Sequence, residues 1–223
     1  MDRTALQPGL RQSGPPALPA PSDLDMPPIT ADCPLILASG SRYRAGLLAR
    51  LGLPFEALPS DADESRLDGE TPRALAERLA LAKARTLSTR HPARWVLGSD
   101  QVAALGDLVL GKPGSRAAAI AQLRAQSGQA VAFITAVALV HEASGALHRH
   151  VDVTTVRFRA LADAEIERYV DAEPAFDCAG SFKSEGLGIA LIEAIESDDA
   201  TGLVGLPLIA VRRLLAEIGC PLP

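Results

Sequence analysis

Short apolar runs alternate with amphipathic stretches from residue 35 to residue 219, which predicts an α/β fold. Several strands are joined by tight turns and others are separated by helices, so we expect a mixed, twisted sheet with flanking helices. Strands are expected at 35–38, 54–58, 95–105, 108–112, 130–140, 148–159 and 187–197. Helices are expected at 42–52, 71–90, 115–128, 162–172 and 204–219.

Local signals set several boundaries of these elements. Thr71 and Pro72 predict the cap and first residue of one helix, and Ser115 predicts the cap of another. The Gly106-Asp107 pair predicts the turn of a hairpin between 95–105 and 108–112. Residues 1–32 are rich in proline and lack apolar periodicity, so we expect a disordered extension followed by one domain at 33–223.

Composition excludes several classes of protein. A net charge of −5 leaves no broad basic surface for nucleic acid. The three cysteines form no CxxC pair, which favours reduced thiols in a cytoplasmic protein. No apolar run approaches the roughly 18 residues that span a bilayer, and the N-terminus has no signal-peptide pattern. We therefore expect neither a membrane nor a nucleic-acid partner.

The loop 38–44, with the sequence ASGSRYR, is a candidate phosphate site. It leads from a strand into a helix, where backbone N–H groups attract anions, and four side chains add donors: Ser39, Ser41, Arg42 and Arg44. It lacks the GxxxxGK[ST] pattern of a P-loop. A capped helix start without a ligand remains the alternative.

Asp100 follows an apolar strand, where a carboxylate is costly to bury without a partner. A divalent cation or a lysine would justify it, and a turn cap is the alternative. An acid cluster at 61–65 is either a solvated face or a source of a second metal ligand. The glycine-rich loop 178–188 places Lys183 beside Glu185, which suggests either a ligand-binding loop or a surface ion pair.

Lysine is rare in this chain. Of the 22 lysines and arginines, only three are lysines: Lys83, Lys112 and Lys183. Each of them falls in or near a motif, and placement by chance is the alternative. A phosphate loop, carboxylates for Mg²⁺ or Mn²⁺, and lysines for a developing anion together suit hydrolysis of a phosphoanhydride.

Several motifs, in order, resemble the Maf family of nucleotide pyrophosphatases. They are LILASGSRYRAGLLARLGLPFEALPSDADE, LGSDQV, GKP and DCAGSFKSEGLG…LVGLPL, and they extend from about Leu35 to Ile218. SDQV and FKSEG resemble the 7-methyl-GTP branch rather than the dTTP/UTP branch. The resemblance implies a fold like that of Maf and inosine-triphosphatase proteins, a divalent metal and, in many members, a dimer. It also implies cleavage of the α–β phosphoanhydride of a nucleoside triphosphate.

The resemblance carries roles to individual residues. Asp100 falls on the proposed proton acceptor, Glu64 on a second acid, and Lys83 and Lys112 on catalytic lysines. Glu64 and Asp100 are then the candidate metal ligands, while either of them could instead orient water. Substrate-binding positions fall on Ser39, Ser41, Arg44 and Lys183, and positions linked to base choice on Tyr43, Gln101 and Glu185.

The base-choice residues make physical sense. Guanine offers two adjacent donors, which a carboxylate at Glu185 accepts as a fork, whereas the carbonyls of a pyrimidine would repel it. An aromatic ring at Tyr43 would stack on the cationic 7-methylguanine and add about 0.5–2 kcal/mol, unless it is only a half-buried helix residue.

The chain departs from the family at Arg42, Ala45 and Ala136, and the first two alter the phosphate loop. Two alternative functions remain. One is hydrolysis of another nucleotide substrate of the same family, and the other is regulation of cell division by a nucleotide-binding protein.

Overall fold

The computed structural model describes residues 27–220 and residue 222, which form a mixed sheet of seven strands with helices around it. The strand order is β2-β1-β3-β5-β6-β7, and β4 pairs only with β3. Strands β2, β1 and β3 are parallel, and the remaining pairs are antiparallel. The predicted mixed sheet is confirmed. The strands are β1 (Leu35–Ala38), β2 (Phe55–Leu58), β3 (Val96–Leu105), β4 (Leu108–Leu110), β5 (Ala130–His141), β6 (Ala146–Phe158) and β7 (Ile192–Glu196).

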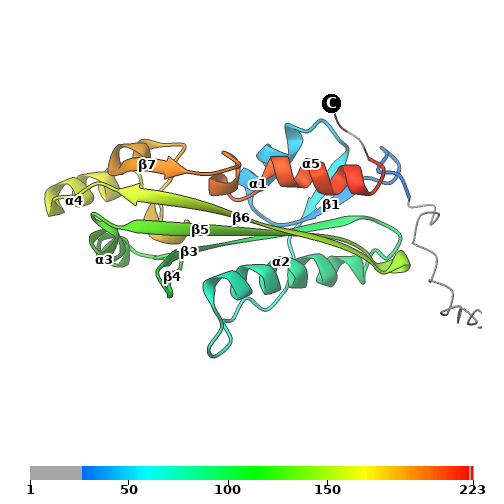
Figure 1. The fold of residues 1–223 in the computed structure, drawn as a ribbon, viewed down its shortest axis with the longest axis horizontal. Coiled ribbons are helices and arrows are strands. Elements are labelled where there is room, and N and C mark those ends of the chain that lie inside the picture. The colour runs from blue at the N-terminus through cyan, green and yellow to red at the C-terminus, as the bar shows by residue number, and fades with distance from the viewer. Residues whose placement is uncertain (1–26, 221, 223) are drawn as a thin grey trace, which may run out of the picture.

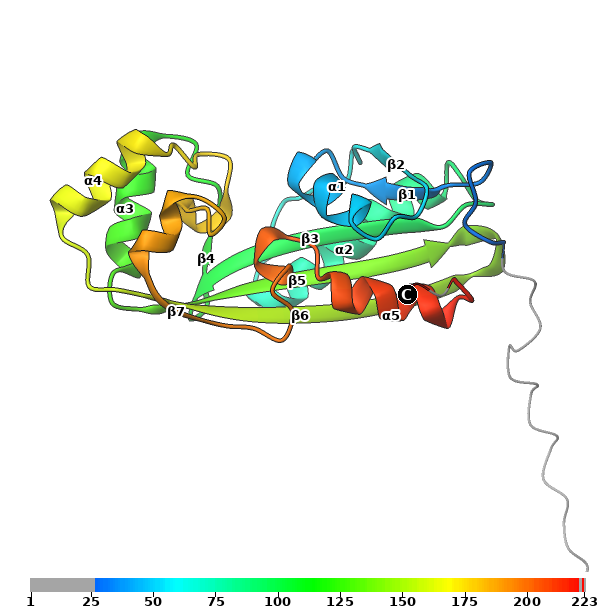
Figure 2. The same cartoon turned by 90° about the horizontal axis from the view of Figure 1, so that it is seen from above.

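The α-helices fall into three groups around the sheet. Figure 1 shows α2 on one face and α1 and α5 on the other, and Figure 2 shows α3 and α4 together at one end. The helices are α1 (Arg42–Ala49), α2 (Pro72–Ser88), α3 (Arg116–Gln126), α4 (Asp163–Ala172) and α5 (Leu208–Glu217). Short 3₁₀ helices are η1 (Glu142–Ser144), η2 (Ala179–Ser181), η3 (Leu187–Leu191) and η4 (Gly202–Val204).

Strand alternation divides the residues of β3 between the two faces. Leu97 packs in the core beneath α1 and α5, whereas Val96 packs against α2. Since successive side chains point to opposite faces, Asp100 belongs to the α2 face and Gln101 to the other face. This split decides which neighbours each polar residue of β3 can reach.

Sequence signals at the element ends are largely confirmed. The side chains of Thr71 and Ser115 accept hydrogen bonds from the backbone amides three residues later, at 3.2 and 3.3 Å. Gly106 has φ 59° in the β3–β4 turn, a conformation that glycine adopts without strain.

Two expected elements differ from the structure. The stretch 187–197 is a strand only from Ile192, because its first half forms η3. The last helix begins at Leu208 rather than at residue 204, since Pro207 lies at its N-cap and the preceding residues form η4. Residues 1–26 of the expected disordered extension lie outside the described residues. Among residues 27–32, Ile29 packs against the core beneath α1 and α5.

Candidate active site

A pocket of about 530 Å³ lies at the carboxyl end of β1, between the 38–44 loop and the 177–185 loop. Its size is in the range of small-molecule sites. Every site residue predicted from the sequence lines this pocket except Asp100. The lining includes Ser39, Ser41, Tyr43, Arg44, Glu64, Lys83, Gln101, Lys112, Lys183 and Glu185. The tertiary fold therefore gathers residues that are up to 146 positions apart in the chain.

Asp100 lies directly behind the pocket wall and is joined to it by Lys83. The Nζ atom of Lys83 lies 2.6 Å from Asp100 Oδ1 and 2.8 Å from Glu64 Oε1. Asp100 and Lys83 are 6% and 7% exposed, so this is a buried contact. Lys83 is thus a lysine partner of the kind proposed for Asp100 from the sequence.

Gly98 allows this contact to form. A Cβ atom at this position would lie 2.2 Å from the carbonyl oxygen of Ala80 and 2.7 Å from the amide of Ala84. Helix α2 therefore lies close against β3, which brings Lys83 over Asp100, two residues along the strand. The glycine in LGSDQV is needed for packing rather than for a turn.

The two carboxylates differ in their electrostatics. Burial raises the pKa of Asp100, and the charge of Lys83 opposes that rise only in part. Burial acts to raise the pKa of Glu64 as well, but Lys83, Lys112 and Arg44 together hold it below its ordinary value. Relative to a free carboxylate, Asp100 therefore binds a proton more tightly and Glu64 binds one less tightly. The higher proton affinity of Asp100 suits a proton acceptor.

Asp100 has one oxygen free of the lysine. Within the described part of the chain, Oδ2 accepts no hydrogen bond. It is also not one of the side-chain polar atoms that lack both a partner and contact with solvent, so it retains some exposure to solvent. Oδ1 is held by Lys83, so Oδ2 is the oxygen that water can approach.

The 38–44 loop forms the expected cap at the start of α1. The hydroxyl of Ser39 accepts from the amide of Ser41 at 3.1 Å, and the hydroxyl of Ser41 accepts from the amide of Arg44 at 3.4 Å. The Nε atom of Arg44 donates to the carbonyl of Gly205 at 2.9 Å. Burial lowers the pKa of Arg44, while Asp100 and Glu64 act to raise it. The loop is both a helix cap and part of the pocket wall.

Ser99 is a site residue that the sequence analysis did not identify. It is fully buried, and its hydroxyl donates to the carbonyl of Gly205 at 3.0 Å, the same oxygen that holds Arg44. Its position directly before Asp100 was the available signal. Gly205 has φ 114°, and its carbonyl links β3 to the arginine of the phosphate loop.

Gln101 contacts protein groups as well as the pocket. Its Nε2 atom lies 3.0 Å from Thr135 Oγ1, 2.9 Å from Gly202 O and 3.0 Å from Leu203 O. These contacts fasten η4, which supplies Leu203 to the pocket lining. The geometry thus gives Gln101 a role in shaping the wall of the pocket.

The 177–185 loop presents Lys183 and Glu185 from the opposite side. The hydroxyl of Tyr169 accepts from the amide of Lys183 at 3.1 Å, and Lys183 Nζ lies 3.8 Å from Asp177. Glu173 accepts from the amide of Gly188 at 3.2 Å. Glu185 is exposed, so its carboxylate is available to a ligand. Helix α4 therefore holds the backbone of this loop while the charged ends stay at the pocket.

Tyr43 lies at the pocket mouth beneath a guanidinium group. The Cζ atom of Arg42 is 4.9 Å from the centroid of the Tyr43 ring, and its Nη2 donates to the Tyr43 hydroxyl at 3.0 Å. Arg42 is one of the departures from the family pattern. A base that stacks on Tyr43 would have to share the ring with Arg42 or displace it.

The donor set fits a divalent cation that also binds substrate phosphate. Among the described residues, no group of three or more histidine, cysteine or acidic side chains forms a metal cluster. Glu64 and Asp100 nevertheless both contact Lys83 Nζ, which places their carboxylates close together, and each has a second oxygen outside that contact. Mg²⁺ commonly takes one or two carboxylates and completes its shell with substrate phosphates and water.

The fold and the pocket together define a mixed α/β protein with a cationic, carboxylate-containing site of the kind that binds phosphate groups. The family model described as Maf-like protein matches residues 34–218, so the chain belongs to this family. A 7-methyl-GTP pyrophosphatase of Xanthomonas oryzae pv. oryzae (strain MAFF 311018) is 58% identical, over 85% of this chain and 98% of that protein. One of Polaromonas sp. (strain JS666 / ATCC BAA-500) is 56% identical, over 85% and 86%.

A structural likeness is weaker. A HAM1 protein from Coxiella burnetii has a TM-score of 0.41 and 18% identity, covering 56% of this chain and 72% of that one. A likeness of this size adds nothing to the family assignment. Within residues 27–220, no helix is long and apolar enough to cross a membrane.

Proposed function

We propose that the protein is a nucleoside triphosphate pyrophosphatase that hydrolyses 7-methyl-GTP to 7-methyl-GMP and pyrophosphate. One observation carries the proposal: five cationic side chains line the pocket, and one of them, Lys83, contacts both Glu64 and, behind the pocket wall, Asp100. The cations are Arg42, Arg44, Lys83, Lys112 and Lys183. The relatives that bear the name of this activity are similar over almost their whole length.

The positions of the cations suggest how a triphosphate would be held. The phosphates would lie between the 38–44 loop and the lysines, where Arg44 and Lys112 neutralise charge and the hydroxyl of Ser41 donates a hydrogen bond. Lys183 would hold the substrate from the opposite loop. Positioning and charge stabilisation supply most of the catalysis in phosphoryl transfer.

The carboxylates would then activate water. Asp100 would accept the proton of a water molecule at Oδ2 as the water oxygen bonds to the α-phosphorus, and the α–β phosphoanhydride bond would break in line with that attack. Lys83 and Lys112 would stabilise the leaving pyrophosphate. Glu64 and Asp100 would also hold Mg²⁺ or Mn²⁺, which when bound neutralises phosphate charge and polarises the reacting phosphoryl group.

The base would be selected by acceptor groups and by stacking. The exposed carboxylate of Glu185 suits the paired donors of guanine, and the ring of Tyr43 suits a cationic purine. Gln101 would act on the shape of the site through η4. The three free cysteines fit a reducing compartment, so we expect the enzyme to act in the cytoplasm, as a monomer or a homodimer.

The test is a panel of nucleoside triphosphates incubated with Mg²⁺ or Mn²⁺, with pyrophosphate and monophosphate measured as products. We expect 7-methyl-GTP to be cleaved with the highest kcat/KM. Preferential cleavage of UTP or dTTP would refute 7-methylguanine as the preferred base, but it would leave the proposed pyrophosphatase reaction intact. Nucleotide binding without pyrophosphate release would refute the enzyme and favour a binding regulator.

A further inference from the structure

The segment between β2 and α2 supplies part of the pocket wall although it has no regular secondary structure. Residues 59–71 contain neither helix nor strand, yet Pro59, Ser60 and Glu64 line the pocket. The Glu64 side chain is 54% exposed, and its contact with Lys83 is the only ion pair it makes among the described residues. Packing alone therefore does not explain why Glu64 lies at Lys83.

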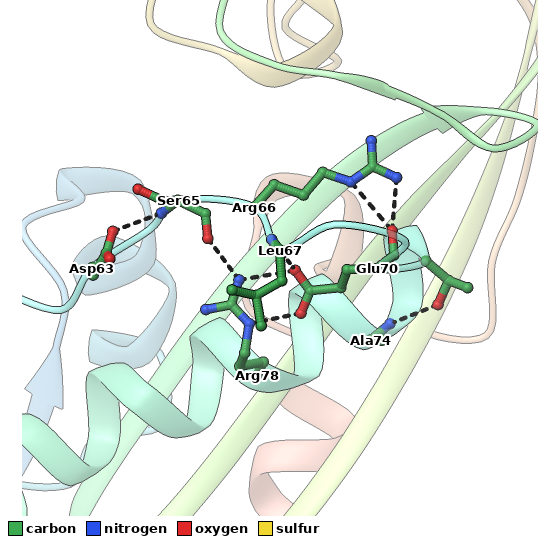
Figure 3. Close-up of polar contacts among 8 residues, drawn as sticks. Asp63, Ser65, Arg66, Leu67, Glu70, Ala74 and Arg78 are labelled. Atoms are coloured by element: carbon green, nitrogen blue, oxygen red, sulfur yellow. Dashed lines mark hydrogen bonds and ion pairs between the residues drawn. The ribbon is translucent and has the colours of Figure 1, made fainter.

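Arg78 holds this segment from helix α2. Its Nε atom lies 2.6 Å from Glu70 Oε1, and its Nη2 atom lies 2.9 Å from Glu70 Oε2 (Figure 3). The same Nη2 also donates to the carbonyl of Ser65 at 2.9 Å. The Glu70 side chain is only 7% exposed, which makes this forked pair more than a surface contact.

Further bonds fix the residues on both sides of Glu64. Asp63 Oδ1 accepts from the amide of Ser65 at 2.9 Å, so both the amide and the carbonyl of Ser65 are held. Glu70 Oε2 accepts from the amide of Leu67 at 3.2 Å, and Arg66 Nη2 donates to the carbonyl of Glu70 at 2.7 Å. Figure 3 shows these contacts closing the segment into a compact loop over the start of α2.

Helix α2 fixes the distance between the two anchoring points. Arg78 and Lys83 are five residues apart on one helix, a rise of roughly 7.5 Å. Arg78 binds the residue directly after Glu64, and Lys83 binds the side chain of Glu64. A rigid helix thus holds both the backbone and the carboxylate of the same short stretch.

We propose that Arg78 and Glu70 are positioning residues that hold Glu64 at the pocket. Neither lines the pocket, so they act through Glu64 rather than on a ligand. The effect on catalysis rests on the proposed function, whereas the effect on the segment does not. The exposed Arg73–Glu77 pair, on the same helix, provides a matched control because it contacts no part of the segment.

Limited proteolysis tests the positioning without any assay of activity. We expect trypsin to cleave after Arg66 at least about tenfold faster in Arg78→Ala than in Arg73→Ala, well below the melting temperature of either, because opening the segment exposes the bond. Mass spectrometry identifies the cleavage site, and Arg78→Lys should give an intermediate rate. Equal rates in Arg78→Ala and Arg73→Ala would overturn the proposal.

A double-mutant cycle tests whether Arg78 acts through Glu64. With the nucleotide that the protein hydrolyses, Arg78→Ala should lower kcat about 10- to 100-fold, the range typical of partners that orient a ligating side chain, with a smaller change in KM. Adding Arg78→Ala to Glu64→Gln should cost little more, because the residue that Arg78 positions is already lost. Fully additive losses would overturn the link to Glu64. If the wild type hydrolyses no nucleotide, the proposed function fails, and proteolysis still decides the positioning.

Discussion

Lys83 on α2 and Asp100 on β3 form a buried ion pair, with Nζ and Oδ1 2.6 Å apart. The same ammonium group reaches Glu64 at 2.8 Å and so links three segments of the chain. One lysine thereby offsets part of the repulsion between these two carboxylates. Substitutions at these positions should therefore affect stability and activity in different proportions.

Replacing Lys83 should damage stability as well as activity. Lys83→Met leaves Asp100 buried without its ion-pair partner, which typically costs about 3–5 kcal/mol in the free energy of unfolding. Urea denaturation measures that loss. The double variant Lys83→Met/Asp100→Asn removes the stranded charge and should regain much of the stability. If the double variant were no more stable than Lys83→Met, the charge would not be the cause.

Replacing Asp100 should mainly damage activity. Asp100→Asn keeps the shape of the side chain, and Lys83 keeps its contact with Glu64, so the fold should survive. Loss of the proton acceptor should lower kcat by at least roughly 10²-fold. Pyrophosphate release and far-UV circular dichroism measure the two effects. A folded variant with near-normal kcat would exclude Asp100 as the base.

Replacing Glu185 should change the preference for the base. Glu185→Gln turns one acceptor into a donor, so it can pair with a pyrimidine carbonyl but loses one bond to guanine. We expect kcat/KM to fall about tenfold or more for 7-methyl-GTP and to rise for UTP relative to it. Competition between the two nucleotides measures the ratio. An unchanged ratio would mean that Glu185 does not contact the base.

Adding a methyl group at Gly98 should separate β3 from α2. Its Cβ would meet the backbone at Ala80 and Ala84, which cannot yield as a flexible side chain can. Gly98→Ala should lower the free energy of unfolding by about 1–3 kcal/mol and reduce activity, because Lys83 moves away from Asp100. The control is Gly46→Ala at an exposed position of α1, where a Cβ meets no atom within 4 Å outside the helix's own backbone. That substitution should stabilise by about 0.5–1 kcal/mol.

A buried carboxylate outside the pocket predicts a pH-dependent stability. Burial, and then the charge of Asp199, raise the pKa of Asp152, while His150 and Thr154 act to lower it. The folded protein therefore holds the proton more tightly than the unfolded chain, and stability falls as the pH rises above the ordinary aspartate pKa. Asp152→Asn should raise the melting temperature at pH 8 more than at pH 4. An equal change at both values would contradict this assignment.

The sequence predicted elements with strong local signals and missed contacts that form only in three dimensions. The cap at Thr71 and the turn at Gly106 depend on neighbouring residues, so both were predictable. The strand expected from residue 187 failed because an apolar run does not distinguish a 3₁₀ turn from a strand. In the site, the lysine partner of Asp100 was one of two options, and only packing at Gly98 identifies it as Lys83. Ser99 resembled an ordinary strand residue until its contact with Gly205, 106 residues away, was known.

One face of strand β5 runs unbroken through two separate hydrophobic clusters. Val131 and Phe133 pack with α3 and α4, whereas Val137 and Leu139 pack with α1 and α5. The pocket walls are attached to both clusters, yet no hinge segment interrupts the strand between them. Strands β3, β5 and β6 each extend through both ends with continuous pairing, so the two ends share one uninterrupted sheet. The pocket can therefore adapt through its loops and through twisting of the sheet, without independent unfolding of one half.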